Sequence, residues 1–137
     1  MYVGSIIVIL LTGINSIQDI RKREIFFFLT IAVGVAGVIW SLSQGANFSE
    51  IMIAFVPGIM LILLSVLTKG KIGIGDAVIL LAIGCWRDVY YVFFVLLTAL
   101  MIASAAGIFC IINKKRKIEL PFVPFLFAGC LLRILLV

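Results

Sequence analysis

The sequence has little charge and no histidine. Only 12% of its 137 residues are charged, whereas 65% are apolar. Soluble domains carry roughly 25% charged residues. A chain this small has too much surface to bury such an apolar excess in a core of its own. We therefore expect lipid to be the solvent around most of the chain.

Patterns of metal or redox ligands are also missing. The three cysteines, Cys85, Cys110 and Cys130, stand inside separate apolar runs without a CxxC pair. Zinc and dithiol sites need cysteine and histidine ligands at close spacing. Neither a metal nor another cofactor is expected, and the cysteines are interpreted as small buried apolar side chains.

The long apolar runs predict six transmembrane helices. A helix that crosses the hydrocarbon core needs about 20 mostly apolar residues. The first run has no basic residue before it and no small-residue cleavage site, so it is interpreted as a retained helix and not as a signal peptide. The predicted spans are approximately 2–18, 25–42, 51–68, 74–86, 89–112 and 120–137. Only short connections remain, and we expect one all-α membrane domain over residues 1–137.

The basic residues predict the orientation of these spans, because lysine and arginine favour cytoplasmic loops. Six spans divide the loops into two sets, of which the first, third and fifth loops form one. The basic residues of that set are Arg21, Lys22, Arg23, Lys69, Lys71, Lys114, Lys115, Arg116 and Lys117. The other set, with the termini, holds only Arg87 and Arg133. Both termini are predicted to lie outside, and the basic loops to contact anionic lipid in the cytoplasm, not nucleic acid.

Two of the acidic residues are candidates for a functional site. Asp19 directly follows the first span and Asp76 opens the fourth, so the topology places both near the cytoplasmic face. Carboxylates at membrane depth are costly and usually face a bundle interior or a water-filled cavity. For Asp76 the alternative is a helix N-cap, a position that favours aspartate.

Two glycines precede the second of these aspartates. Gly73 and Gly75 flank Ile74 and remove side chains next to Asp76. Glycine allows backbone torsions closed to other residues and close approach of a ligand. A short, glycine-interrupted membrane segment is also typical of a binding site. These residues predict a ligand cleft at the start of the fourth span.

The segment Gly73-Ile74-Gly75-Asp76 matches the GxGD motif of the GxGD-type aspartic peptidases. Together with Asp19, which Arg21 and Ile25 follow, it resembles the type IV prepilin peptidases. A third similarity is the proline-phenylalanine segment at 121–126, which opens the last span. The order and spacing of the three motifs agree with the six-helix core of that family over nearly the whole chain.

The resemblance implies an aspartic endopeptidase of the prokaryotic inner (plasma) membrane. Asp19 and Asp76 are then the catalytic pair, and Gly73 and Gly75 help to form the substrate cleft. Pro121 and Pro124 either shape the same cleft or are ordinary prolines of a helix start. The implied substrates are precursors of type IV pilins or pseudopilins, cut at the cytoplasmic face between a short basic leader and a hydrophobic helix.

Two departures from the family pattern affect the expected subfamily. Phe26-Phe27 stands where the family often has Pro-Asn, and Val78 stands where it often has lysine. Nothing corresponds to the four-cysteine methyltransferase segment of larger members, so a peptidase-only form is expected.

Two other functions remain open from the residues alone. A small transporter or assembly subunit would use the aspartates for protons or cations without cutting a peptide. A signal-peptide-peptidase type protease shares GxGD, but it normally has Tyr-Asp on the partner helix, where this chain has Gln18 before Asp19.

Overall fold

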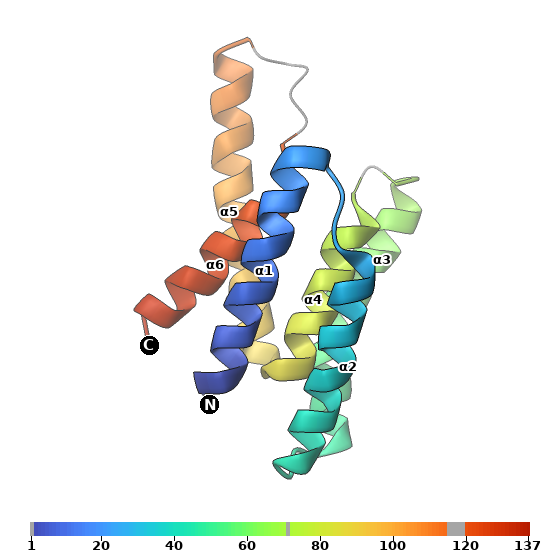
Figure 1. Ribbon diagram of the computed structural model, residues 1–137. Coiled ribbons are helices and arrows are strands. Elements are labelled where there is room, and N and C mark those ends of the chain that lie inside the picture. Colours follow the sequence, from blue (N-terminus) through green and yellow to red (C-terminus); the bar gives the residue numbers. More distant parts are fainter. Residues whose placement is uncertain (1, 71, 115–119) are drawn as a thin grey trace.

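The computed structural model describes residues 2–70, 72–114 and 120–137, in which all regular secondary structure is helical (Figure 1). The helices are α1 (Tyr2–Lys22), α2 (Phe27–Ser43), α3 (Phe48–Leu67), α4 (Ile74–Trp86), α5 (Val89–Ile112) and α6 (Val123–Leu135). The predicted all-α class is therefore confirmed for the described residues.

The helices keep the predicted order and differ from the predicted spans at some ends. The bounds of α4 and α5 are those expected from the sequence. The first helix runs past Asp19 to Lys22, because a charged residue ends an apolar run without ending a helix. The second and sixth helices begin later than predicted, at Phe27 and Val123, although apolar residues precede both.

Three helices, α1, α3 and α5, are long and apolar enough to cross a membrane on that basis alone. The other three are apolar but shorter. Successive helices alternate in direction, and both chain ends lie away from the end where α1 stops and α4 starts (Figure 1). This alternation is what six crossings require, while the six-span topology and the outside termini stay predictions. Among the basic residues used for orientation, Lys71 and residues 115–117 lie outside the described residues.

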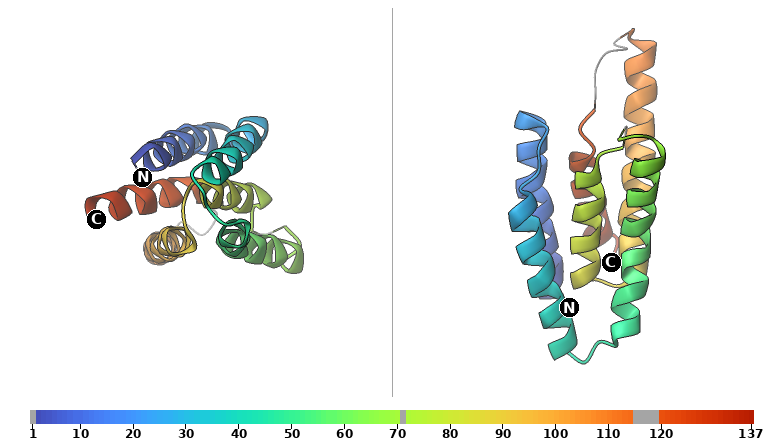
Figure 2. Two further views of the ribbon diagram at one scale, coloured as in Figure 1. Left: turned by 90° about the horizontal axis from the view of Figure 1, so that it is seen from below. Right: turned by 90° about the vertical axis from the view of Figure 1, so that its right-hand side faces the viewer.

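The bundle consists of two groups of three helices. In one group, the α1 half, α6 packs between α1 and α5; in the other, the α4 half, α4 packs between α2 and α3. Figure 2 (left) shows the two groups as adjacent columns when the bundle is seen from below. The halves meet through α3 and α5 on one side, and α1 packs less extensively against α2 and α4 on the other. We call this second, thinner boundary the seam.

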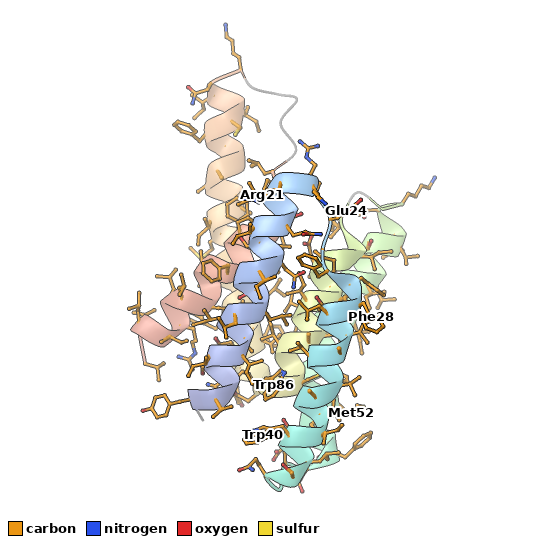
Figure 3. All side chains as sticks on the ribbon, viewed as in Figure 1. Arg21, Glu24, Phe28, Trp40, Met52 and Trp86 are labelled. Carbon is orange, nitrogen blue, oxygen red and sulfur yellow. The ribbon has the colours of Figure 1, made fainter. Side chains whose placement is uncertain are left out.

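The centre of the bundle is filled by α4 and the residues around it. Ile79, Leu80 and Ile83 have no exposed surface, and they belong to one apolar cluster with residues of α1, α5 and α6. The outside of the bundle is apolar as well, as at Phe28 and Met52 (Figure 3). An apolar centre inside an equally apolar surface is the pattern of a protein surrounded by lipid.

The central position of α4 depends on close approach of backbones. A Cβ atom on Gly84 would lie 2.7 Å from the carbonyl oxygen of Ala54 in α3. On the other side of the helix, a Cβ atom on Gly4 of α1 would lie 3.0 Å from the carbonyl oxygen of Trp86. Small residues at such crossings let membrane helices pack closely without a hydrophobic driving force.

Candidate active site

Asp19 and Asp76 line one open cavity of about 1270 Å³ at the end of the bundle where α1 stops and α4 starts. The two carboxyl groups come from different halves of the bundle, and they are close enough for their charges to interact. Both side chains are half-buried. A further cavity of about 620 Å³, at the opposite end beside Trp86 and Asp88, is lined by neither aspartate.

The position of Asp19 is fixed by the helix on which it lies and by the start of α6. Asp19 is in the last turn of α1, and its Oδ2 atom accepts a hydrogen bond of 3.2 Å from the backbone N–H of Val123. The first N–H groups of a helix have no partner within that helix. The carboxyl group therefore satisfies a donor at the start of α6 and joins the ends of two helices of the same half.

Asp76 is the third residue of α4, not its N-cap. The N-cap is Gly73, and the backbone N–H of Asp76 donates to the Gly73 carbonyl oxygen over 3.2 Å. The N-cap interpretation of Asp76 is therefore wrong, because the helix begins earlier than that interpretation requires. The Asp76 carboxyl group turns back over Gly73, where a Cβ atom would lie 3.2 Å from Oδ2.

The two glycines of the GxGD segment provide space and do not adopt unusual torsions. Gly73 has φ −66°, and the described glycines with positive φ are Gly45 and Gly70. The expectation of special backbone torsions before Asp76 is therefore wrong. A Cβ atom on Gly75 would lie 3.2 Å from two side-chain carbons of Ile25, so this glycine admits the segment between α1 and α2.

That segment forms one wall of the cavity. Arg23, Glu24 and Ile25 all line it, and Glu24 is seen with Arg21 at this end of the bundle in Figure 3. Arg23 has φ 55°, and its backbone N–H donates to the Asp19 carbonyl oxygen over 2.9 Å. The chain thus turns sharply after α1 and passes over the cavity before α2 begins.

The remaining walls are mostly apolar. Residues of α3 and α5 contribute Leu61, Leu64, Leu100, Ala103 and Ser104. An apolar lining with a small number of polar groups is typical of a ligand-binding cleft.

The predicted proline motif contributes only in part. Pro121 lines the cavity, and so does Phe122. Pro124 is not among the lining residues and occupies the first turn of α6, where proline is favoured because no helical partner exists for an N–H. Of the two departures from the family pattern, Phe27 lines the cavity and Val78 does not.

The sequence interpretation missed two contributors to this site. The Val123 N–H is a backbone group, so no residue type signals it. Asn15 is a buried polar residue one helical turn before Asp19, and a polar side chain inside an apolar span could have indicated a structural or functional role.

Comparison with known proteins identifies a family. Residues 6–112 match the family model of the type IV leader peptidase family. The matched part contains Asp19, Gly73, Gly75 and Asp76, and it ends before Pro121. No curated protein and no solved structure matches the chain.

Proposed function

The chain belongs to the type IV leader peptidase family, and on that premise we propose that it removes the basic leader of prepilin-like precursors with Asp19 and Asp76 as its catalytic pair. The family membership indicates a peptidase. The aspartic mechanism, the cytoplasmic face of the prokaryotic inner membrane and the prepilin or pseudopilin substrate are parts of the proposal.

One observation carries the proposed mechanism. Two carboxyl groups far apart in the sequence line the same cavity and interact through their charges. Two adjacent carboxylates do not both ionise readily, so such a pair shares one proton near neutral pH. A shared proton supplies a general base and a general acid in one site.

The reaction proceeds in two steps. The ionised carboxylate removes a proton from a water molecule, while the protonated one donates a hydrogen bond to the scissile carbonyl oxygen. The water oxygen bonds to the carbonyl carbon and gives a tetrahedral intermediate. The C–N bond then breaks as a carboxyl group protonates the leaving amine. The Val123 N–H holds the Asp19 carboxyl group in one orientation for both steps.

The shape of the cavity supports a peptide substrate. Its volume of about 1270 Å³ exceeds the roughly 300–1,000 Å³ of a typical small-molecule pocket. The missing side chain at Gly73 leaves room beside the Asp76 carboxyl group for an extended backbone, whereas the space at Gly75 is taken by Ile25. The apolar residues of α3 and α5 offer a surface for the hydrophobic helix that follows the cleavage point in such precursors.

A co-expression experiment tests this proposal. Candidate prepilins would be produced with the wild type, with Asp19→Asn or with Asp76→Asn, and leader removal would be followed by the mass of the product. Glu50→Gln is the matched control, because Glu50 is a carboxylate at the far end of the bundle that lines the other cavity. We expect cleavage by the wild type and the control, and none by either aspartate variant.

Two results would count against the proposal. Undiminished processing by Asp19→Asn or by Asp76→Asn would refute the proposal that these two residues are the catalytic pair. If the wild type cuts none of a broad set of prepilins, the leader-peptidase function itself is rejected, and proton or cation flux through the bundle becomes the next measurement.

A further inference from the structure

We propose that Asn15 and Thr30 are positioning residues that set the distance between Asp19 and Asp76. Their catalytic consequence depends on the function proposed above, whereas the geometric claim does not.

The need for positioning follows from the division of the bundle into two halves. Asp19 lies on α1 and is bonded to the start of α6, so it belongs to the α1 half. Asp76 lies on α4 in the other half. The distance between the two carboxyl groups is therefore a distance across the seam, and any shift of one half against the other changes it.

At the end away from the aspartates, the seam is held by close packing. The Gly4 backbone approaches the Trp86 carbonyl oxygen, as described above. A single contact at one end of a seam does not by itself prevent rotation of one half about that contact. Such a rotation displaces the opposite end most, and the opposite end carries the aspartates.

Nearer to the aspartates, a buried polar network crosses the seam from α1 to α2. The Asn15 Oδ1 atom accepts a hydrogen bond of 2.8 Å from the backbone N–H of Phe26. Its Nδ2 group donates to the Thr30 hydroxyl at 3.1 Å and to the Leu11 carbonyl oxygen at 3.0 Å. The Thr30 hydroxyl in turn donates to the Phe26 carbonyl oxygen at 2.9 Å. Asn15 and Thr30 have no exposed surface.

This network leads directly to both aspartates. Asn15 and Asp19 are four residues apart on α1 and lie on the same face of the helix. On the other side, Phe26 follows Ile25, whose side chain contacts the Gly75 position beside Asp76. Hydrogen bonds depend on direction and fail when partners slide, whereas apolar contacts tolerate sliding. The network therefore fixes the position of α2 relative to α1, which apolar packing across the seam would leave adjustable.

A departure from the family pattern gives this network one of its donors. Phe26 stands where proline is frequent, and proline has no N–H to donate. The bond from Phe26 to Asn15 thus exists because this chain has a non-proline residue here. The φ angle of Phe26 is −74°, within the range of proline, so Phe26→Pro would remove the donor while the local φ is kept.

A buried polar residue of α1 without this role provides the matched control. Thr12 is as buried as Asn15, and its hydroxyl donates to the Val8 and Ile9 carbonyl oxygens of its own helix. Thr12→Val and Thr30→Val make the same change of hydroxyl to methyl inside the bundle. Only the second removes a group that bonds across the seam.

The distance itself would be measured by cross-linking. Asp19→Cys and Asp76→Cys would be combined in a chain whose natural cysteines are replaced by alanine, and reacted with bifunctional thiol reagents of increasing length. We expect Thr30→Val and Phe26→Pro to slow the reaction with the shortest effective reagent and shift it to longer ones. Thr12→Val, Phe26→Ala and Thr30→Ser, which keep the crossing bonds, should react as the parent does. Thermal unfolding in detergent would verify that each variant is folded.

The kinetic consequence would be measured in the chain with both aspartates intact. A displacement of about 1 Å between reacting groups costs roughly 100-fold in rate, so Thr30→Val and Phe26→Pro should lower kcat by about 10- to 100-fold with little change in KM. Recovery of kcat in Thr30→Ser would separate positioning from a general loss of stability.

The outcomes distinguish this inference from the proposed function. Unchanged cross-linking in both Thr30→Val and Phe26→Pro overturns the positioning role, even if the chain cleaves prepilins. An equal loss of cross-linking in Thr12→Val overturns it as well, because the effect would then be one of general packing. If no prepilin is cleaved but cross-linking shifts as expected, the positioning role stands and the proposed function fails.

Discussion

Replacement of Gly73 by alanine should slow cleavage without unfolding the chain. The new Cβ atom would lie 3.2 Å from Oδ2 of Asp76. Ordinary carbon–oxygen contacts are a few tenths of an ångström longer, so the carboxyl group has to move by about that amount. The φ angle of −66° is open to alanine, so no backbone strain adds to this effect.

The size of the effect follows from that displacement. If about 1 Å of misplacement costs roughly 100-fold in rate, a few tenths of an ångström corresponds to a loss of about 3- to 10-fold in kcat. Gly73→Val adds two methyl groups at the same place and should lower the rate further. The assay is the rate of leader removal from a purified prepilin in detergent or lipid.

Gly107→Ala is the control, since a Cβ atom there has no neighbour within 4 Å. It should leave the rate unchanged. Full activity of both Gly73→Ala and Gly73→Val would refute the reasoning, because it would show that the space beside Asp76 is not needed for the reaction.

Three further predictions concern stability and reactivity. Gly84→Ala places a methyl group against a carbonyl oxygen of α3. It should lower the free energy of unfolding in detergent by about 1–3 kcal/mol. An unchanged unfolding midpoint would contradict the close contact between α3 and α4. Trp86→Phe removes the indole N–H that donates to the Val33 carbonyl oxygen at 2.9 Å. It should lower the free energy of unfolding by about 0.5–1.5 kcal/mol in the same measurement. A stability equal to that of the wild type would show that the bond is dispensable. Cys110 is half-buried whereas Cys130 is buried, so a maleimide should modify Cys110 first in the folded protein. The order of labelling would be read by peptide mass. Faster labelling of Cys130 would contradict the packing of α6.

The apolar runs were sufficient to predict the helical class and the order of the helices. The pair Arg87 and Asp88 interrupts two apolar runs, and the bounds of α4 and α5 follow from that interruption. The predicted helix ends were less accurate where the end of an apolar run is not the end of the helix. The first helix continues through Arg21 because arginine and lysine are good helix formers outside the apolar region as well.

The start of α2 depends on tertiary contacts that no local pattern contains. Ile25 and Phe26 are as apolar as the helix that follows, yet the Phe26 N–H is bonded to Asn15, which lies earlier in the chain. The same limit applies to the candidate site. Asp19 and Asp76 could be selected from residue type and depth, whereas the Val123 N–H that holds Asp19 could not.

The length of α4 has a consequence for the depth of Asp76 in the bilayer. At 13 residues, α4 is about 20 Å long, whereas the hydrocarbon core of a bilayer is about 30 Å thick. Because the other helices surround α4, the difference is not met by lipid. With α4 crossing as predicted, water enters the cavity above the start of the helix. Asp76 then lies below the general level of the membrane surface, in a depression filled by water. A peptide entering from the cytoplasm would stay hydrated down to the bond that is cut, and its polar backbone would not have to cross hydrocarbon to reach the aspartates.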